Sequence, residues 1–129
     1  YTSNILPSIV SGKFANVPVL MGSNLDEAQI FLAVAGLDSG TNLVDGVLAV
    51  TGLNISSIEN SLLSKYAAEG IDGGLALLNR VVTDLLFTCT TQSVASAIKL
   101  AGRQKIWRYR YDATFPNLQL FPNAGAYHT

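Results

Sequence analysis

The chain has 129 residues, of which 13% are charged and 49% are hydrophobic, and its formal net charge is −1. An average soluble domain has about 25% charged residues, so the composition favours either a chain that is partly buried against other polypeptide or a compact domain with a neutral polar surface. The even charge balance excludes the basic excess of a nucleic-acid-binding domain. No apolar run reaches the roughly 18 residues of a bilayer span, and we expect no obligatory membrane segment.

The first predicted element is a buried strand. The run from Val17 to Gly22 is apolar without alternation, which is typical of a strand buried on both faces of a parallel sheet. Ser23 and Asn24 then offer helix caps, and residues 25–35 continue with apolar residues at helical spacing. Glu27 completes a capping box with Asn24, which by itself predicts a structural role for its carboxylate.

Further helices follow a connection rich in Gly, Asp, Asn and Ser over residues 36–46. Apolar residues at helical spacing predict one helix over about 56–68, a second that Asp72 caps and that extends to about residue 86, and a third over about 91–101. Gly102 would end the last of these at the usual position. Helices this apolar are expected to be packed elements.

The second predicted strand, over 105–111, alternates between two faces. We expect its aromatic face to be packed, and we expect Arg108 and Arg110 on the other face to be ion-paired or solvated. The aromatic face consists of Trp107, Tyr109 and Tyr111. Residues 112–129 contain two Phe-Pro-Asn turns, so His128, the sole histidine, is expected on a loop; a solvated tail is its simplest interpretation.

Two further residues have open interpretations. Cys89 is the single cysteine, so no disulfide forms within the chain. We favour a buried small hydrophobic residue here, with a disulfide to another segment or a reactive thiol as the alternatives. Asn54, in Asn-Ile-Ser, is the only glycosylation candidate, and it matters only in a secreted protein.

Four segments carry a resemblance to a known family when they are taken together. They are Gly22-Ser-Asn-Leu-Asp-Glu-Ala28, Asp84-x-x-Phe87-x-Cys89, Trp107-Arg-Tyr-Arg-Tyr111 and Gly125-Ala-Tyr-His128. In this order they resemble the C-terminal part of the type-B carboxylesterase/lipase family, the cholinesterase-like α/β-hydrolases, with fungal secreted members the most similar. Ala28 departs from the pattern, because many members have Gly there.

The resemblance implies an α/β fold in which residues 1–129 form the C-terminal portion of one α/β-hydrolase domain and not a complete domain. Two sheet strands, three to four helices and a long loop carrying the histidine are expected. It further implies a secreted carboxylic ester hydrolase with a Ser-Glu-His triad, in which Glu27 is the acid and His128 is the base. The side chain of Asp26 should leave the turn in another direction.

The chemistry of these side chains suits the implied roles. A serine hydroxyl becomes a good nucleophile only when a base within hydrogen-bond reach accepts its proton, and a carboxylate on the far imidazole nitrogen orients that base. Both Glu27 and His128 follow predicted strands, where sites gather in open α/β sheets. No serine of the chain lies in G-x-S-x-G. We therefore expect the serine and the oxyanion hole in the N-terminal part of the same enzyme, and no activity from this chain alone.

Two other readings stay open. One is a non-catalytic, cholinesterase-like binding or adhesion module, and the other is an excised fragment without activity of its own. The acyl and alcohol specificity of the ester substrate, and the residues that bind it, are not predicted. An apolar patch before the histidine either packs the loop or lines an acyl site, and we favour packing; it comprises Phe115, Leu118, Leu120 and Phe121. We expect no cofactor and no metal.

Overall fold

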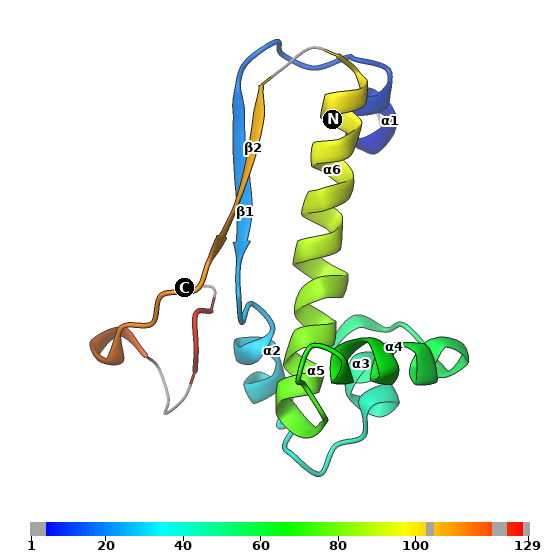
Figure 1. Cartoon of the computed structure of the whole chain (residues 1–129), viewed down its shortest axis with the longest axis vertical. Helices are drawn as coiled ribbons and strands as arrows, with labels where there is room; N and C mark the ends of the chain where they lie inside the picture. The colour runs from blue at the N-terminus through cyan, green and yellow to red at the C-terminus, as the bar shows by residue number, and fades with distance from the viewer. Residues whose placement is uncertain (1–4, 103–104, 120–123, 128–129) are drawn as a thin grey trace.

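The computed structural model describes residues 5–102, 105–119 and 124–127 of the chain. It is a mixed structure of helices and two strands. The elements in chain order are α1 (Ile5–Val10), β1 (Val19–Asn24), α2 (Gln29–Val34), α3 (Leu43–Thr51), a 3₁₀ turn (Ser56–Ile58), α4 (Glu59–Ala67), α5 (Gly74–Thr83), a π-helical turn (Asp84–Thr88), α6 (Cys89–Leu100), β2 (Ile106–Tyr111) and a 3₁₀ turn (Pro116–Leu118). Figure 1 shows the strands standing beside α6, with the shorter helices α2 to α5 gathered at one end.

The two strands form a parallel pair whose register runs from Val19 opposite Ile106 to Asn24 opposite Tyr111. Both predicted strands are therefore present, each shifted by one or two residues. Parallel pairing places the carboxyl ends of β1 and β2 side by side, because the strands point the same way. The observed structure is compatible with the α/β class.

The predicted burial of the strands is wrong. Leu20 of β1 is 70% exposed, and Trp107 and Tyr109 of β2 are each 52% exposed on the same face of the pair. Helix α6 packs against both strands, and within the described residues we find no element over the aromatic face. Arg108 and Arg110 are exposed, as expected for solvated arginines.

Helix α5, the π-helical turn and α6 form one continuous helix from Gly74 to Leu100. The sequence predicted two helices here, separated after residue 86. By length and composition this helix is able to cross a membrane, which the sequence did not lead us to expect. The core helix of a soluble protein meets the same criterion, and α5 contributes several buried residues to the core, among them Leu77, Leu78, Val81 and Val82.

The hydrophobic core lies at the end of the molecule where the short helices gather. It is built from α2, α3, α4 and α5, and its most deeply buried large side chains include Leu32, Val47 and Leu78. Helix α3 approaches α5 closely at Gly46, where an added Cβ would lie 2.5 Å from a Leu78 methyl carbon. This core holds the start of α5 and the turn after β1 in fixed relation.

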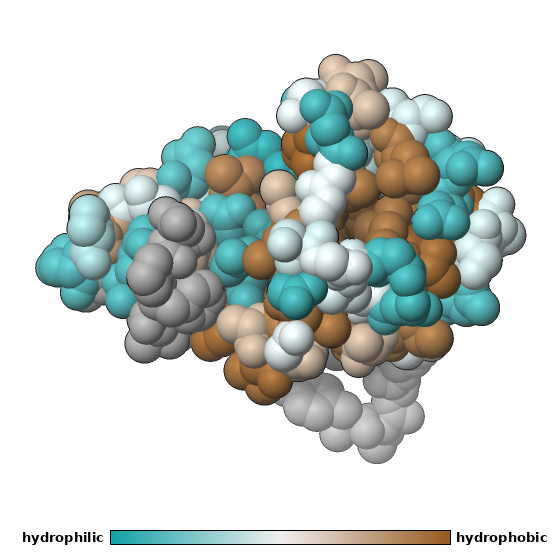
Figure 2. All heavy atoms as spheres, turned by 90° about the horizontal axis from the view of Figure 1, so that it is seen from below, coloured by the Kyte–Doolittle hydropathy of each residue, from teal (hydrophilic) through white to brown (hydrophobic). Residues whose placement is uncertain are grey.

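Other apolar side chains remain exposed near this core. Val34 and Leu53 are 84% and 50% exposed, and Figure 2, which views the molecule from below, shows apolar surface between the polar groups. Together with the open aromatic face of the strands, this exposed apolar surface accompanies the low charge content of the chain.

Candidate functional site

The turn after β1 places Glu27 in a buried position. Residues 25–28 form a turn, and α2 begins only at Gln29, so the predicted helix over 25–35 is shorter than expected. The Asn24 backbone N–H donates to Oε1 of Glu27 at 2.8 Å, which is the capping-box contact predicted from the sequence. Glu27 is only 4% exposed. A buried carboxylate at the carboxyl end of a parallel strand lies where α/β proteins gather functional groups.

Asp26 occupies the same turn but has different partners. The side-chain amide of Asn79, on α5, donates to Oδ1 of Asp26 at 2.8 Å. The Ala126 backbone N–H donates to Oδ2 at 2.9 Å. The Asp26 side chain thus leaves the turn in a different direction from that of Glu27, as predicted, and both of its oxygens are in use.

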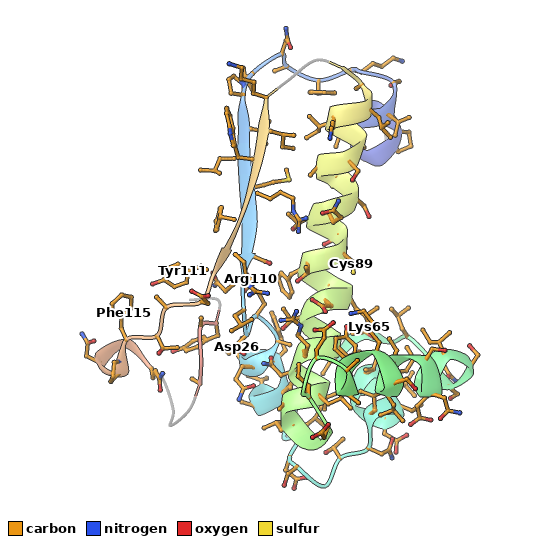
Figure 3. The ribbon with its side chains drawn as sticks, viewed as in Figure 1. Asp26, Lys65, Cys89, Arg110, Tyr111 and Phe115 are labelled. Atoms are coloured by element: carbon orange, nitrogen blue, oxygen red, sulfur yellow. The ribbon has the colours of Figure 1, made fainter. Side chains whose placement is uncertain are left out.

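The segment 124–127, directly before His128, lies against the turn that carries Glu27. The Asp26 backbone N–H donates to the Ala126 carbonyl at 2.9 Å, which pairs the two segments a second time. Ala124, Ala126 and Tyr127 are all buried. His128 itself lies outside the described residues, so the predicted histidine loop is seen only up to Tyr127. Figure 3 shows Asp26 between this segment and the helices.

Gly125 is the residue that permits this close approach. Its φ is +73°, in the left-handed region that favours glycine, and an added Cβ would lie 2.3 Å from Asp26 Oδ2. Any side chain at this position would displace the carboxylate of Asp26. A glycine is therefore required both by the backbone conformation and by the space available.

A small open cavity of about 120 Å³ adjoins the same segment, and its lining includes Tyr111, Phe115 and Tyr127. Phe115 is 51% exposed, so the packing role that we favoured for the apolar patch is wrong for this residue. The side chains of Leu118, Leu120 and Phe121 lie outside what the structure describes. The cavity therefore presents aromatic side chains beside the segment that leads to His128.

The turn is also hydrogen-bonded to α5. The Ala28 backbone N–H donates to the Thr83 hydroxyl at 3.0 Å, and both residues are buried. Sequence reasoning did not identify Asn79, Thr83 or Gly125 as parts of this site. Their roles depend on contacts between distant segments, and the only sequence signal was the resemblance of Gly125-Ala-Tyr-His128 to a family motif.

A second polar cluster forms around Asp84, at the end of α5. The Tyr66 hydroxyl donates to Asp84 Oδ2 at 2.8 Å, and Arg80 Nε donates to the same oxygen at 3.2 Å. Burial raises the pKa of Tyr66 well above its ordinary value, and the hydrogen bond to Asp84 and the Asp84 charge raise it further, while Arg80 opposes them. This cluster joins α4 to the π-helical turn.

The raised pKa of Tyr66 predicts a pH dependence of stability. The folded state keeps this proton above the pKa of an unfolded tyrosine, near 10, so its contribution is complete below about pH 10 and is lost as the pH rises further. We expect the free energy of unfolding to fall above about pH 10 more steeply in the wild type than in Tyr66→Phe. Urea denaturation measures this, with Tyr109→Phe, an exposed tyrosine, as control. Equal slopes in wild type and Tyr66→Phe would contradict it.

Two other predicted residues are placed by the structure. Cys89 is exposed at the start of α6, so the buried role that we favoured is wrong, because this position faces away from the core. Asn54 is exposed in a loop, where its side chain accepts hydrogen bonds from the amide and hydroxyl of Ser56. Among the described residues, no group of three His, Cys, Asp or Glu side chains is arranged to hold a metal ion.

Comparison of the chain with protein-family models, with curated proteins and with solved structures found no match in any of the three.

Proposed function

We propose that the chain is the acid-and-base portion of a serine carboxylic ester hydrolase, in which Glu27 is the acid and His128 is the base. The observation that carries the proposal is the pairing of the segment before His128 with the turn that carries Glu27. This pairing brings the segment that precedes His128 to the turn that carries Glu27, at the carboxyl end of β1, and so supports a site shared by the two residues. The family resemblance supplies the roles.

In the proposed mechanism His128 accepts the proton of a serine hydroxyl, and the serine attacks the ester carbonyl to give an acyl-enzyme. His128 then donates the proton to the departing alcohol, and water removes the acyl group by the same route. Glu27 holds the imidazole in the correct tautomer and stabilises its charged form. The rigid placement of Glu27, buried and bonded to the Asn24 amide, suits that orienting role.

The serine and the oxyanion donors are proposed to lie in the N-terminal part of the same enzyme, with residues 1–129 as the C-terminal portion of one α/β-hydrolase domain. The open strand pair supports this. Parallel sheets occur almost only with both faces covered, whereas Leu20, Trp107 and Tyr109 are exposed here. Further strands and helices of the same domain would cover them. The exposed Asn54 is compatible with a secreted, glycosylated enzyme.

A second function, from another class, has its own support. The aromatic face of β2 is the kind of surface that protein partners bind, since Tyr and Trp are enriched in interfaces. A non-catalytic, cholinesterase-like binding or adhesion module would use this face and would need no serine. Reaction with a serine-directed probe separates the two functions.

The test is the intact mass of the protein as isolated from its source, before and after reaction with a fluorophosphonate probe. We expect a polypeptide well above 13.7 kDa that gains a single probe on a serine in a G-x-S-x-G turn. We also expect the pure 129-residue chain to take no label and to hydrolyse no p-nitrophenyl butyrate. A full-length polypeptide that takes no label would favour the binding module. If the 129-residue chain alone hydrolysed the ester and His128→Ala abolished that activity, the proposal that the serine lies outside this chain would be refuted.

A further inference from the structure

Asp26 has no role in the proposed chemistry, yet it makes hydrogen bonds to two segments that are distant from it along the chain. Its carboxylate accepts from Asn79 on α5 and from the Ala126 amide, and its own amide donates to the Ala126 carbonyl. The side chain of Asp26 and its backbone therefore both bind Ala126. Two bonds between the same pair of residues fix the orientation of the segment as well as its distance.

We propose that Asp26 is a positioning residue. Its hydrogen bonds to Ala126, called the latch below, hold the 124–127 segment at the turn after β1 and so place His128 next to Glu27. This inference rests on the proposed function. The base follows Ala126 by two residues, which span at most about 7 Å of extended chain. The acid is the residue next to Asp26. A latch at this point therefore constrains the separation of acid and base.

The charge of Asp26 is essential to the latch. A carboxylate accepts from Asn79 and from Ala126 at the same time, and hydrogen bonds to an ionised acceptor are roughly twice as strong as neutral ones. In Asp26→Asn the amide has one oxygen and one NH₂ group, so it keeps at most one of these acceptor bonds and turns a donor toward the other donor. The substitution keeps the shape of the side chain and removes its function.

The test uses the full 129-residue chain and two NMR readouts. The first is hydrogen exchange of the Ala126 amide. The second is the imidazole nitrogen signal of His128, which is unambiguous because the chain has one histidine; its response to Glu27→Gln reports whether acid and base are in contact. Both readouts are taken in the wild type, in Asp26→Asn and in Asp72→Asn, a matched control at an exposed aspartate.

We expect Asp26→Asn to accelerate exchange of the Ala126 amide by roughly tenfold to a hundredfold, the loss expected for a hydrogen bond to a charged group. The His128 signal should respond to Glu27→Gln in the wild type and in Asp72→Asn, and the response should vanish in Asp26→Asn. A merely structural Asp26 would change exchange without changing the response of His128. That result, or unchanged exchange, overturns the proposal.

Failure of the proposed function gives a different result. If Glu27→Gln leaves the His128 signal unchanged in the wild type, the acid–base pair does not exist and the latch has nothing to position. Should Asp26→Asn not fold, Gly125→Ala tests the same contact from the loop side, where its Cβ meets Asp26 Oδ2 and the helical core is untouched. It should accelerate exchange and abolish the His128 response in the same way, and an unchanged response would overturn the proposal.

Discussion

Replacing Glu27 by glutamine is expected to lower kcat about 10⁴-fold in the proposed complete hydrolase, because a neutral amide leaves the histidine in the wrong tautomer. Glutamine has the same shape as glutamate, and its carbonyl oxygen still accepts from the Asn24 amide, so the turn should keep its structure. Turnover of p-nitrophenyl butyrate at saturating substrate measures the loss.

The matched control is Glu59→Gln, at a partly exposed glutamate in the first turn of α4. It should leave kcat within a factor of about two, since surface substitutions away from a site change little. If Glu27→Gln lost less than about tenfold in kcat, Glu27 would not be the triad acid, and its carboxylate would serve only to cap the turn.

Replacing Leu78 by alanine is expected to lower the free energy of unfolding by about 2–5 kcal/mol. Leu78 is 1% exposed, lies on α5 in the centre of the core and contacts α3 at Gly46, so its removal leaves a cavity between two helices. Urea denaturation measures the change. The loss is a large part of the total for a domain of this size, because proteins are stable by only about 5–15 kcal/mol.

Leu100→Ala makes the same chemical change at a side chain that is 87% exposed at the end of α6. It should cost less than about 0.5 kcal/mol. Equal losses in the two variants would mean that the helical core is not where the stability of the chain resides.

The strands were predictable from the sequence, but their environment was not. Alternation in 105–111 correctly separated the aromatic face of β2 from the face that carries the arginines. Alternation does not say which face another element covers, and α6 packs on the arginine side, so the aromatic side is open. The side chains that were expected to be packed are consequently the exposed ones.

The helices show where local patterns fail. Helix α3 begins at Leu43 after Asn42, which accepts from the Asp45 amide as an N-cap. The preceding Gly- and Asn-rich residues, and Gly46 within the helix itself, lower its helical propensity, so the sequence indicated a connection. Helices α5 and α6 were predicted as separate helices. The π-helical turn that joins them changes the backbone hydrogen-bond pattern, and the spacing of apolar residues does not reveal such a change.

The site was predictable only in part. Glu27 and His128 came from a resemblance, and the capping contact of Glu27 came from local spacing, which the structure confirms. The contacts of Asp26 join residues about 50 and 100 positions apart along the chain. Such contacts are set by tertiary packing and leave no periodic signal in a single sequence.

The most direct test of the central claim is whether Glu27 and His128 act as one unit on the same serine. We would measure the rate of fluorophosphonate labelling in the complete enzyme for the wild type, Glu27→Gln, His128→Ala and the double variant. Residues of one triad are strongly non-additive, so the account predicts that the double variant is no slower than His128→Ala alone. Losses that multiply in the double variant, or labelling that is independent of both residues, would contradict it.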